Sequence, residues 1–323
     1  QQYQQQELML LKTLIRPIRQ FAALLKRSLR QNIRDITVNV SRFVASIGLP
    51  LLFGQIFKSL QEGPMTAKGA TDRAVLLSYG IISMMMMAFM KTISCFATER
   101  GVVARERKTN QYSIAEYLLA KIVAEMPLDA SFSLVFATIL KAAVNLNISL
   151  TNLCTACSLV TISGACLGYA VGSISRDKDA DITMGMPIAI LFMLVGVINP
   201  SGVDSSTTPT PWIVRFLKAL SPIRYGIEAV FVGEFKGFEF ESADTRSSSW
   251  TSTIRDLPKM STMSLVKNGD QVLDAMALGN IDFRGNMKSL VILSCSNLFL
   301  SWLFLKLQGT TFMRAKKPKK KKT

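Results

Sequence analysis

Six long apolar stretches dominate this sequence and restrict what it can fold into. They lie near residues 36–57, 74–96, 127–144, 150–174, 183–198 and 287–307. Most of them approach the ~20 residues that an α-helix needs to cross the hydrocarbon core of a bilayer. The composition agrees, since 49% of the residues are hydrophobic, 19% are charged and the mean hydropathy is +0.28. The sequence therefore predicts an all-α membrane protein with six transmembrane helices.

A segment with two contrasting faces precedes the first stretch. Over residues 8–34, apolar side chains such as Leu14 and Ile18 recur at helical spacing, and basic ones such as Arg19 fall on the opposite face. Helices that lie at a membrane interface have this division, although a soluble bundle helix is the alternative. We interpret residues 1–34 as a polar N-terminus that leads into an amphipathic connecting helix.

The basic residues indicate how the chain is oriented. The net charge is +16, and Lys and Arg are dense in both tails and in segments 97–121 and 175–183, but sparse in 58–73 and 145–151. Short loops rich in Lys and Arg stay in the cytoplasm, so we expect a multi-pass protein with both termini cytoplasmic. Such clusters favour membrane lipids over nucleic acid as a partner.

The same pattern divides the chain into parts. The membrane domain is expected over residues 35–308, and a basic cytoplasmic tail follows over 309–323. One long segment, 199–286, falls on the extracellular side. Within it, residues 212–235 are apolar but interrupted at Pro222. A re-entrant helical hairpin fits better than a seventh span, which would place the basic tail outside.

The residue types exclude several kinds of chemistry. The chain has no histidine, which removes the usual general base, the catalytic triad and most zinc or haem sites. No catalytic, metal-binding or cofactor-binding residues are therefore predicted. The five cysteines lie in apolar runs and are interpreted as small buried side chains: Cys95, Cys154, Cys157, Cys166 and Cys295.

Two basic residues lie inside the predicted spans. Arg42 is near the start of the first span and Lys91 is near the end of the second. Their long side chains can reach the membrane surface, so we expect both to snorkel outward and to have no functional role.

Soft and small residues mark the second and fourth spans. The run from Met84 to Met87 is either an adaptable wall for a hydrophobic ligand or lipid-facing packing, and the first and last of these are the cavity candidates. In the fourth span, Gly164, Gly168 and Gly172 form a flat strip. Packing inside one subunit is favoured for this strip over a role in a dimer.

Three further stretches occur in a fixed order. The first runs from Glu99-Arg100-Gly101 to Glu125-Met126-Pro127. The second joins Asn199-Pro200-Ser201-Gly202, Ser221-Pro222-Ile223-Arg224-Tyr225 and Gly233-Glu234-Phe235. The third is Asn268-Gly269-Asp270-Gln271. Together they resemble the membrane domain of the G subfamily of ABC transporters, the White-type half-transporters.

The resemblance implies roles for particular residues and a partner of the same kind. The family's coupling loop, which docks on a nucleotide-binding domain, corresponds to Glu99, Arg100, Arg105, Glu106 and Arg107. The exit gate corresponds to Val197, Ile198 and Asn199. The re-entrant element contains Tyr225 and Glu228. A homodimer or heterodimer with another membrane domain is implied, with a cavity between the second and fifth spans of both subunits.

The chain also departs from the family pattern. It contains neither Gly-x-x-x-x-Gly-Lys-Ser/Thr nor Leu-Ser-Gly-Gly-Gln, the motifs of the ATP-binding half. We therefore expect no ATPase site here, and expect ATP and Mg²⁺ on a nucleotide-binding domain from the same precursor or a separate chain. Because the sequence begins at Gln1, we expect a processed or truncated product or separate coding of the two halves.

These features together predict the membrane-spanning subunit of an ATP-driven exporter that works by alternating access. The cargo is expected to be lipid-like or otherwise apolar or amphipathic, because the predicted cavity walls lack charge. The alternative is a non-transporting structural membrane subunit of a larger complex. The missing motor favours this alternative, whereas the retained docking stretch favours a transporter.

Overall fold

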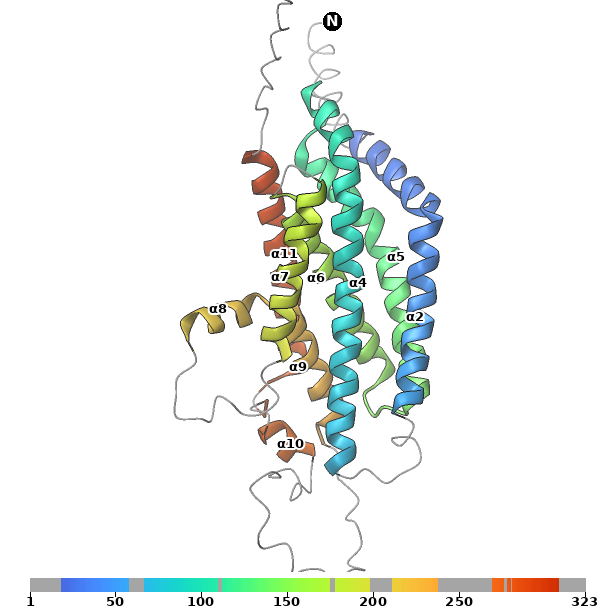
Figure 1. Cartoon of the computed structure of the whole chain (residues 1–323), viewed down its shortest axis with the longest axis vertical. Helices are drawn as coiled ribbons and strands as arrows, with labels where there is room; N and C mark the ends of the chain where they lie inside the picture. The colour runs from blue at the N-terminus through green and yellow to red at the C-terminus, as the bar shows by residue number, and fades with distance from the viewer. Residues whose placement is uncertain are drawn as a thin grey trace, which may run out of the picture.

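The computed structural model describes residues 19–57, 67–109, 112–174, 178–197, 211–237, 269–275, 278–279 and 281–307. All regular structure in these ranges is helical, and the long helices run side by side as an elongated bundle (Figure 1). A helix over residues 19–34 comes first. The others are α2 (Ile36–Ile56), α4 (Ala67–Lys108), α5 (Ile114–Val144), α6 (Leu150–Gly172), α7 (Lys178–Val197), α8 (Trp212–Leu220), α9 (Pro222–Phe235), α10 (Gly269–Ala275) and α11 (Phe283–Leu307).

The long helices identify an integral multi-pass membrane protein. Within the described residues, five helical segments are long and apolar enough to cross a bilayer: Ile36–Ile56, Asp72–Phe96, Ile114–Val144, Leu150–Gly172 and Phe283–Leu307. A sixth apolar segment in α7, Thr183–Gly196, is shorter. These five segments overlap five of the predicted stretches, although the third, Ile114–Val144, begins well before the predicted 127–144. The all-helical prediction is confirmed for the described part of the chain.

Local chemistry fixes the ends of α5. Ser113 accepts a hydrogen bond from the backbone N–H of Glu116, whose carboxylate accepts one from the N–H of Ser113 in return. This capping box satisfies backbone donors that the first turn would leave unpaired. At the other end, Asn145 takes the left-handed conformation, with φ of 53°. That conformation ends the helix and starts the turn into α6.

The region between the second and third spans differs from the expected loop over 97–121. In the structure α4 continues as a helix to Lys108, and α5 already begins at Ile114. Residues 97–108 are rich in Ala, Glu, Arg and Lys, which favour helix once the preceding span has nucleated it. The helix 19–34 also packs beside this extension and binds it, as described below.

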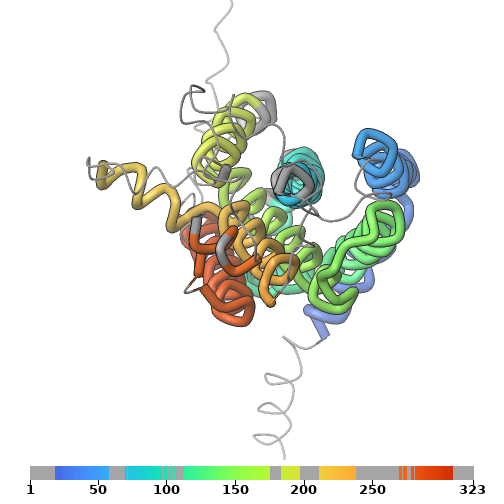
Figure 2. The backbone as a smooth tube through the Cα atoms, turned by 90° about the horizontal axis from the view of Figure 1, so that it is seen from below, coloured from blue at the N-terminus to red at the C-terminus, as the bar shows by residue number. Residues whose placement is uncertain are grey.

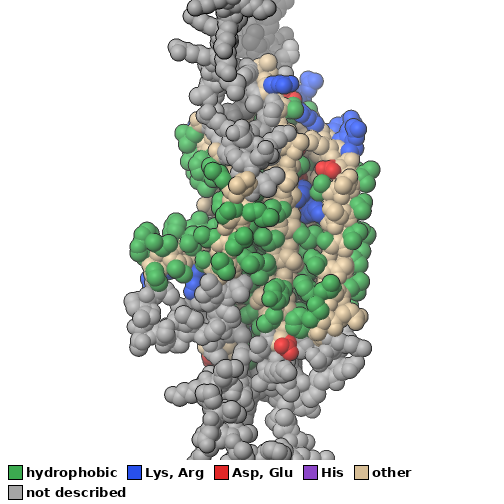
Figure 3. Space-filling view, in the orientation of Figure 1, with side chains coloured by type: hydrophobic (Ala, Val, Ile, Leu, Met, Phe, Trp, Pro, Cys, Tyr) green, Lys and Arg blue, Asp and Glu red, His purple; other side chains and the backbone are tan. Residues whose placement is uncertain are grey.

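The centre of the bundle is α6, which is the most buried of the spans, whereas α2 is the least buried. The helices in contact with α6 include α4, α5, α9 and α11. Figure 2 shows α2 at the margin, next to α5 and set apart from α4. We call the end formed by residues 19–35, 97–109, 112–118 and 305–307 the basic end, because Lys and Arg side chains gather there (Figure 3).

The glycine strip of α6 lies against α4, as the sequence predicts for packing inside one subunit. A Cβ added at Gly164 would be 2.8 Å from the carbonyl oxygen of Met85, and one at Gly168 would be 2.9 Å from Cβ of Thr92. Such distances are too short for real side chains. The missing side chains therefore let the two helices approach closely and gain dispersion contacts along their length.

A buried ion pair holds the helices together at the end opposite the basic end. Glu234 of α9 is buried, and Arg73 of α4 donates from Nη1 to its Oε1 at 2.6 Å. The other oxygen, Oε2, accepts the backbone N–H of Ile148 at 2.9 Å. Lys141 donates from Nζ to the carbonyl of Ile148 at 2.6 Å. One carboxylate thus joins α9, α4 and the turn between α5 and α6.

Replacing Gly168 by Ala tests the close packing of α4 and α6. The new methyl group would meet Cβ of Thr92 at 2.9 Å and the Phe89 carbonyl oxygen at 3.0 Å, so the helices must separate. We expect a loss of about 1–3 kcal/mol of stability, measured by denaturation in detergent micelles. Gly48→Ala in α2 is the matched control, since nothing lies within 4 Å of its added Cβ. Equal stability of the two variants would contradict this packing.

Candidate functional site

Charged side chains are buried where α2, α4 and α5 meet. Arg42 of α2 donates from Nη1 to Oδ1 of Asp129 at 2.6 Å, and Lys91 of α4 lies 3.4 Å from the same oxygen. Lys91 also donates to Oε2 of Glu125 at 2.8 Å. Arg42, Lys91 and Asp129 are only 5%, 8% and 1% exposed. Buried charges are tolerated inside a membrane protein when they are paired in this way.

This geometry corrects the expectation that Arg42 and Lys91 snorkel outward. Both side chains point into the bundle, because carboxylates on α5 face them at hydrogen-bonding distance. The carboxylates pair with the N–H donors of Arg42 and Lys91, which would otherwise lie unpaired in the hydrocarbon core.

The pairing continues along α5 toward the basic end. Lys121 lies 3.5 Å from Oε1 of Glu125 and 2.5 Å from Oε2 of Glu99 on α4. Glu99 also accepts hydrogen bonds from the hydroxyl of Tyr117 and from Nε2 of Gln31, both at 2.8 Å. We call the six connected charged residues the charge network, which contains three cations and three carboxylates: Arg42, Lys91, Glu99, Lys121, Glu125 and Asp129.

A separate ion pair fastens the helix 19–34 to the extension of α4. Arg27 donates from Nη1 to both carboxylate oxygens of Glu106, at 2.7 and 2.9 Å. The hydroxyl of Tyr112 donates to the same carboxylate at 2.7 Å. Partial burial alone would lower the pKa of Arg27, but the hydrogen bond and charge of Glu106 outweigh it and raise that pKa. The guanidinium therefore stays charged across physiological pH.

The structure separates the residues of the predicted coupling loop. Glu99 and Glu106 form the contacts just described. Arg105 is exposed at the basic end. Arg100 and Arg107 belong to α4, but their side chains lie outside the described part.

The other predicted residues belong to later parts of the chain. Val197 is the last residue of α7, its side chain is not described, and Ile198 and Asn199 fall outside the described residues. In α9, Tyr225 donates its hydroxyl to the carbonyl of Ala219 at 3.2 Å. Glu228 accepts from Nε of Arg224 at 2.6 Å.

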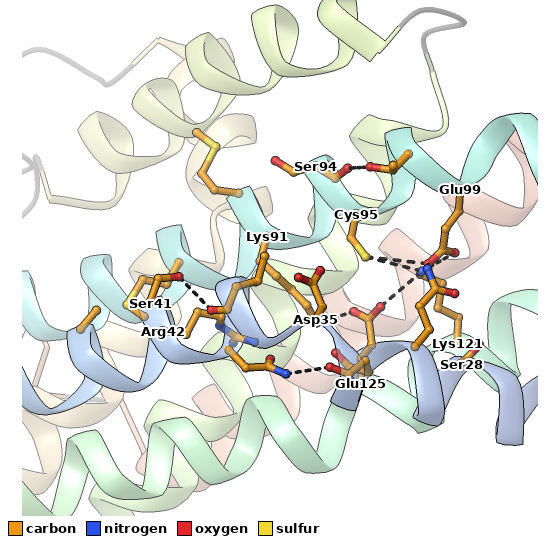
Figure 4. A pocket seen from close by; sticks show the side chains of 18 residues that line it. Ser28, Asp35, Ser41, Arg42, Lys91, Ser94, Cys95, Glu99, Lys121 and Glu125 are labelled. Atoms are coloured by element: carbon orange, nitrogen blue, oxygen red, sulfur yellow. Dashed lines mark hydrogen bonds and ion pairs between the residues drawn. The ribbon is translucent and has the colours of Figure 1, made fainter.

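A pocket of about 510 Å³ lies beside the charge network, between the helix 19–34, α2, α4 and α5 (Figure 4). The size is typical of small-molecule sites. Met87, one of the two cavity candidates, lines this pocket, whereas Met84 is packed in the core with 1% exposure. Figure 4 shows Arg42, Lys91 and Glu125 directed toward one another at the pocket wall.

Sequence reasoning missed the α5 half of the network. Lys121, Glu125 and Asp129 are spaced four residues apart and therefore share one face of a helix. Acidic residues at the edge of an apolar run are a signal that a buried partner is present. The partners could not be found from spacing, because Arg42 and Asp129 are 87 residues apart.

A family model for the ABC-2 type transporter matches residues 19–235. This range includes the helix 19–34, the charge network and the helices from α2 to α9. The chain therefore belongs to the ABC-2 type transporter family of membrane domains.

Known relatives place it near the G-family members of that class. "ABC transporter G family member 7" of Arabidopsis thaliana is 31% identical over 70% of this chain. "Protein white" of Drosophila melanogaster is 24% identical over 90% of the chain, and "ABC transporter ATP-binding protein/permease wht-1" of Caenorhabditis elegans is 27% identical over 83%. The alignments cover 31%, 40% and 37% of the lengths of these relatives. The resemblance to G-subfamily membrane domains is thus confirmed.

The buried network predicts a large effect for Asp129→Asn. The substitution leaves Arg42 and Lys91 facing a neutral amide, and we expect a loss on the order of 3 kcal/mol of stability. The double variant Arg42→Met with Asp129→Asn also removes a positive charge, so the network is again neutral. We expect it to recover part of the lost stability. Denaturation midpoints in detergent micelles measure both changes.

Asp282→Asn is the matched control for this prediction. Asp282 is 82% exposed and lies 3.5 Å from Lys236. An exposed pair of this kind contributes about 0–1 kcal/mol. If Asp129→Asn unfolds at the same midpoint as this control, the network does not stabilise the bundle.

Proposed function

We propose that this chain is the membrane-spanning part of an ATP-driven exporter of the G subfamily. It moves a lipid-like or other amphipathic cargo by alternating access, while ATP and Mg²⁺ are held by a nucleotide-binding domain. Two findings support the proposal. The chain matches the ABC-2 family over residues 19–235, and the name of the worm relative combines an ATP-binding protein with a permease.

The observation that carries the proposal is the set of contacts that joins the helix 19–34 to the extension of α4. Arg27 and Gln31 bind Glu106 and Glu99 on the extension of α4. This extension and the membrane span form one continuous helix of 42 residues, about 63 Å long. A force applied to residues 97–108 therefore reaches the membrane without passing through a flexible joint.

The charge network connects α4 in turn to α5 and α2. Glu99 is bound to Lys121 of α5, and the pairing continues to Arg42 of α2. A displacement of α4 must carry α2 and α5 with it or separate buried charges. We propose that this coupling turns domain closure into a change in the relative positions of the spans.

We propose the following arrangement in the membrane. The basic end lies in the cytoplasm with both termini, α7 serves as the fifth of six spans, and α8 with α9 forms the re-entrant hairpin. The amphipathic shape of α8 supports this, because Trp212, Ile213 and Phe216 are exposed while α9 is mostly buried. Figure 1 shows α8 projecting sideways from the bundle, as a helix at a membrane interface would.

A second copy or a related membrane domain completes the transporter in this proposal. The cargo path would run between α4 and α7 of both subunits, with Val197, Ile198 and Asn199 at its exit. Met84 is fully packed within one chain and Met87 lines the pocket between α2, α4 and α5, so we place neither methionine on this path.

Coupling can be tested with Glu99→Ala combined with Arg105→Ala in the complex with a nucleotide-binding domain. The first change removes the joint between α4, α5 and the helix 19–34, and the second removes an exposed charge at the proposed docking surface. We expect cargo moved per ATP hydrolysed to fall about tenfold, equivalent to about 1.4 kcal/mol of coupling.

Thr109→Ala is the control, since it changes an exposed residue at the same end without altering charge. Unchanged coupling in the double variant would reject this role for residues 97–108. If no ATP-binding protein copurifies with the chain and no cargo moves, the non-transporting structural subunit becomes the better account.

The proposed orientation predicts opposite labelling of two exposed positions. In a background with all five cysteines replaced by Ala, Thr109→Cys lies at the basic end and Lys236→Cys lies at the other end of the bundle. An impermeant maleimide should label the second from outside intact cells and the first only after permeabilisation. Labelling of both from the same face would show that the proposed topology is wrong.

A further inference from the structure

The pocket beside the charge network runs along α2 and α4 and changes character along its length. On α2 its walls extend from Asp35 to Ala45, and on α4 they extend from Glu99 to Met87. Ten residues of helix correspond to about 15 Å, roughly half of a hydrocarbon core. The two helices run in opposite directions, so Asp35 and Glu99 lie together at the basic end.

The innermost lining of the pocket is apolar, whereas mostly polar and charged residues line the rest of it. Its mouth at the basic end contains Gln31 and Asp35, and its inner part contains Met87 and Ala45. Figure 3 shows Lys and Arg side chains in the hollow between α4 and α2, so this side of the pocket opens on the outer face of the bundle. A cavity with this gradient matches a lipid whose head group lies at the basic end and whose chains point inward.

The charges select the kind of head group. The pocket is lined by three cations and three carboxylates: Arg42, Lys91, Lys121, Asp35, Glu99 and Glu125. A lining without net charge does not attract a ligand that carries net charge. It suits a head group that carries one positive and one negative charge, or a head group without charge.

Two lining residues retain hydrogen-bonding capacity. Arg42 is 5% exposed and binds Asp129 through Nη1, but its Nε has no partner. A guanidinium has five N–H donors, so Arg42 can donate to a further negative ligand group beside its ion pair. Asp35 is the N-cap residue of α2, yet its side chain makes no capping hydrogen bond. Its carboxylate is available to an ammonium group at the mouth.

We propose that this pocket binds a zwitterionic glycerophospholipid from the leaflet at the basic end. The phosphate lies toward Arg42, the ammonium toward Asp35, and one acyl chain lies along Met87 and Ala45. The site lies within a single chain, so it goes beyond the proposed function and does not depend on transport. It also differs from the cargo path proposed between two subunits.

Photolabelling of the full chain in vesicles tests the proposal. Vesicles of phosphatidylcholine and phosphatidylglycerol are doped with phosphatidylethanolamine that carries a photoactivatable acyl chain, or with phosphatidylglycerol that carries the same chain. The labelled peptides are mapped by mass spectrometry. We expect the phosphatidylethanolamine probe to label Met87 and Met90 roughly tenfold more than the other probe, as for one hydrogen bond to a charged group.

Two variants separate the pocket from the general lipid surface. Ala45→Phe fills the pocket without changing charge and should remove this labelling, whereas Val44→Phe, at a neighbouring residue with 61% exposure, should leave it unchanged. Asp35→Asn should preserve labelling but bring the ratio of the two probes close to one. The proposal is overturned if both probes label the unmodified chain equally or if neither labels it. It is also overturned if the labelling persists in Ala45→Phe.

The same experiment keeps the two proposals apart. If the complex moves no cargo but the labelling follows the expected pattern, the transport function is rejected and the lipid site stands. If transport is normal and Met87 and Met90 are not labelled, the lipid site is rejected alone.

Discussion

The requirement that buried charges be paired determines how the outer helices join this bundle. The least buried span, α2, is linked to α5 through Arg42 and Asp129, and Lys91 brings α4 to the same carboxylate. In a low-dielectric interior, separating such groups is far more costly than separating apolar side chains. The positions of the three helices relative to one another are therefore specified more sharply than dispersion forces alone would allow, and the pocket beside them has a defined shape.

Two polar ties act at opposite ends of α4 and α5. The charge network and the Arg27–Glu106 pair hold the basic end, while Glu234 joins Arg73 to the turn after α5 at the other end. Beside the network, the glycines of α6 keep it in close contact with α4 near Met85 and Thr92. The contact between α4 and α6 is thus packed by shape, whereas ion pairs join α4 to α5 and α9. Together these contacts keep the spans in register.

The sequence was most informative where a pattern is local. Apolar stretches predicted the spans, Pro222 predicted the break between α8 and α9, and the spacing of Gly164 and Gly168 predicted close packing within one chain. It was least informative where partners are distant. The inward direction of Arg42 depends on Asp129, and the helical extension of α4 is bound by the helix 19–34. No window of sequence contains both members of these pairs.

The separation of Arg42 from Asp129 along the chain also has a consequence for biogenesis. As the chain is synthesised, α2 reaches the membrane 87 residues before its counter-ion exists. An Arg in the middle of an inserting helix costs on the order of 2.5–3.5 kcal/mol, less when it lies near an interface. Until α5 emerges, α2 must remain beside the translocon or hold Arg42 at the lipid head groups. Final docking of the first span is therefore a late event, which follows the synthesis of the third.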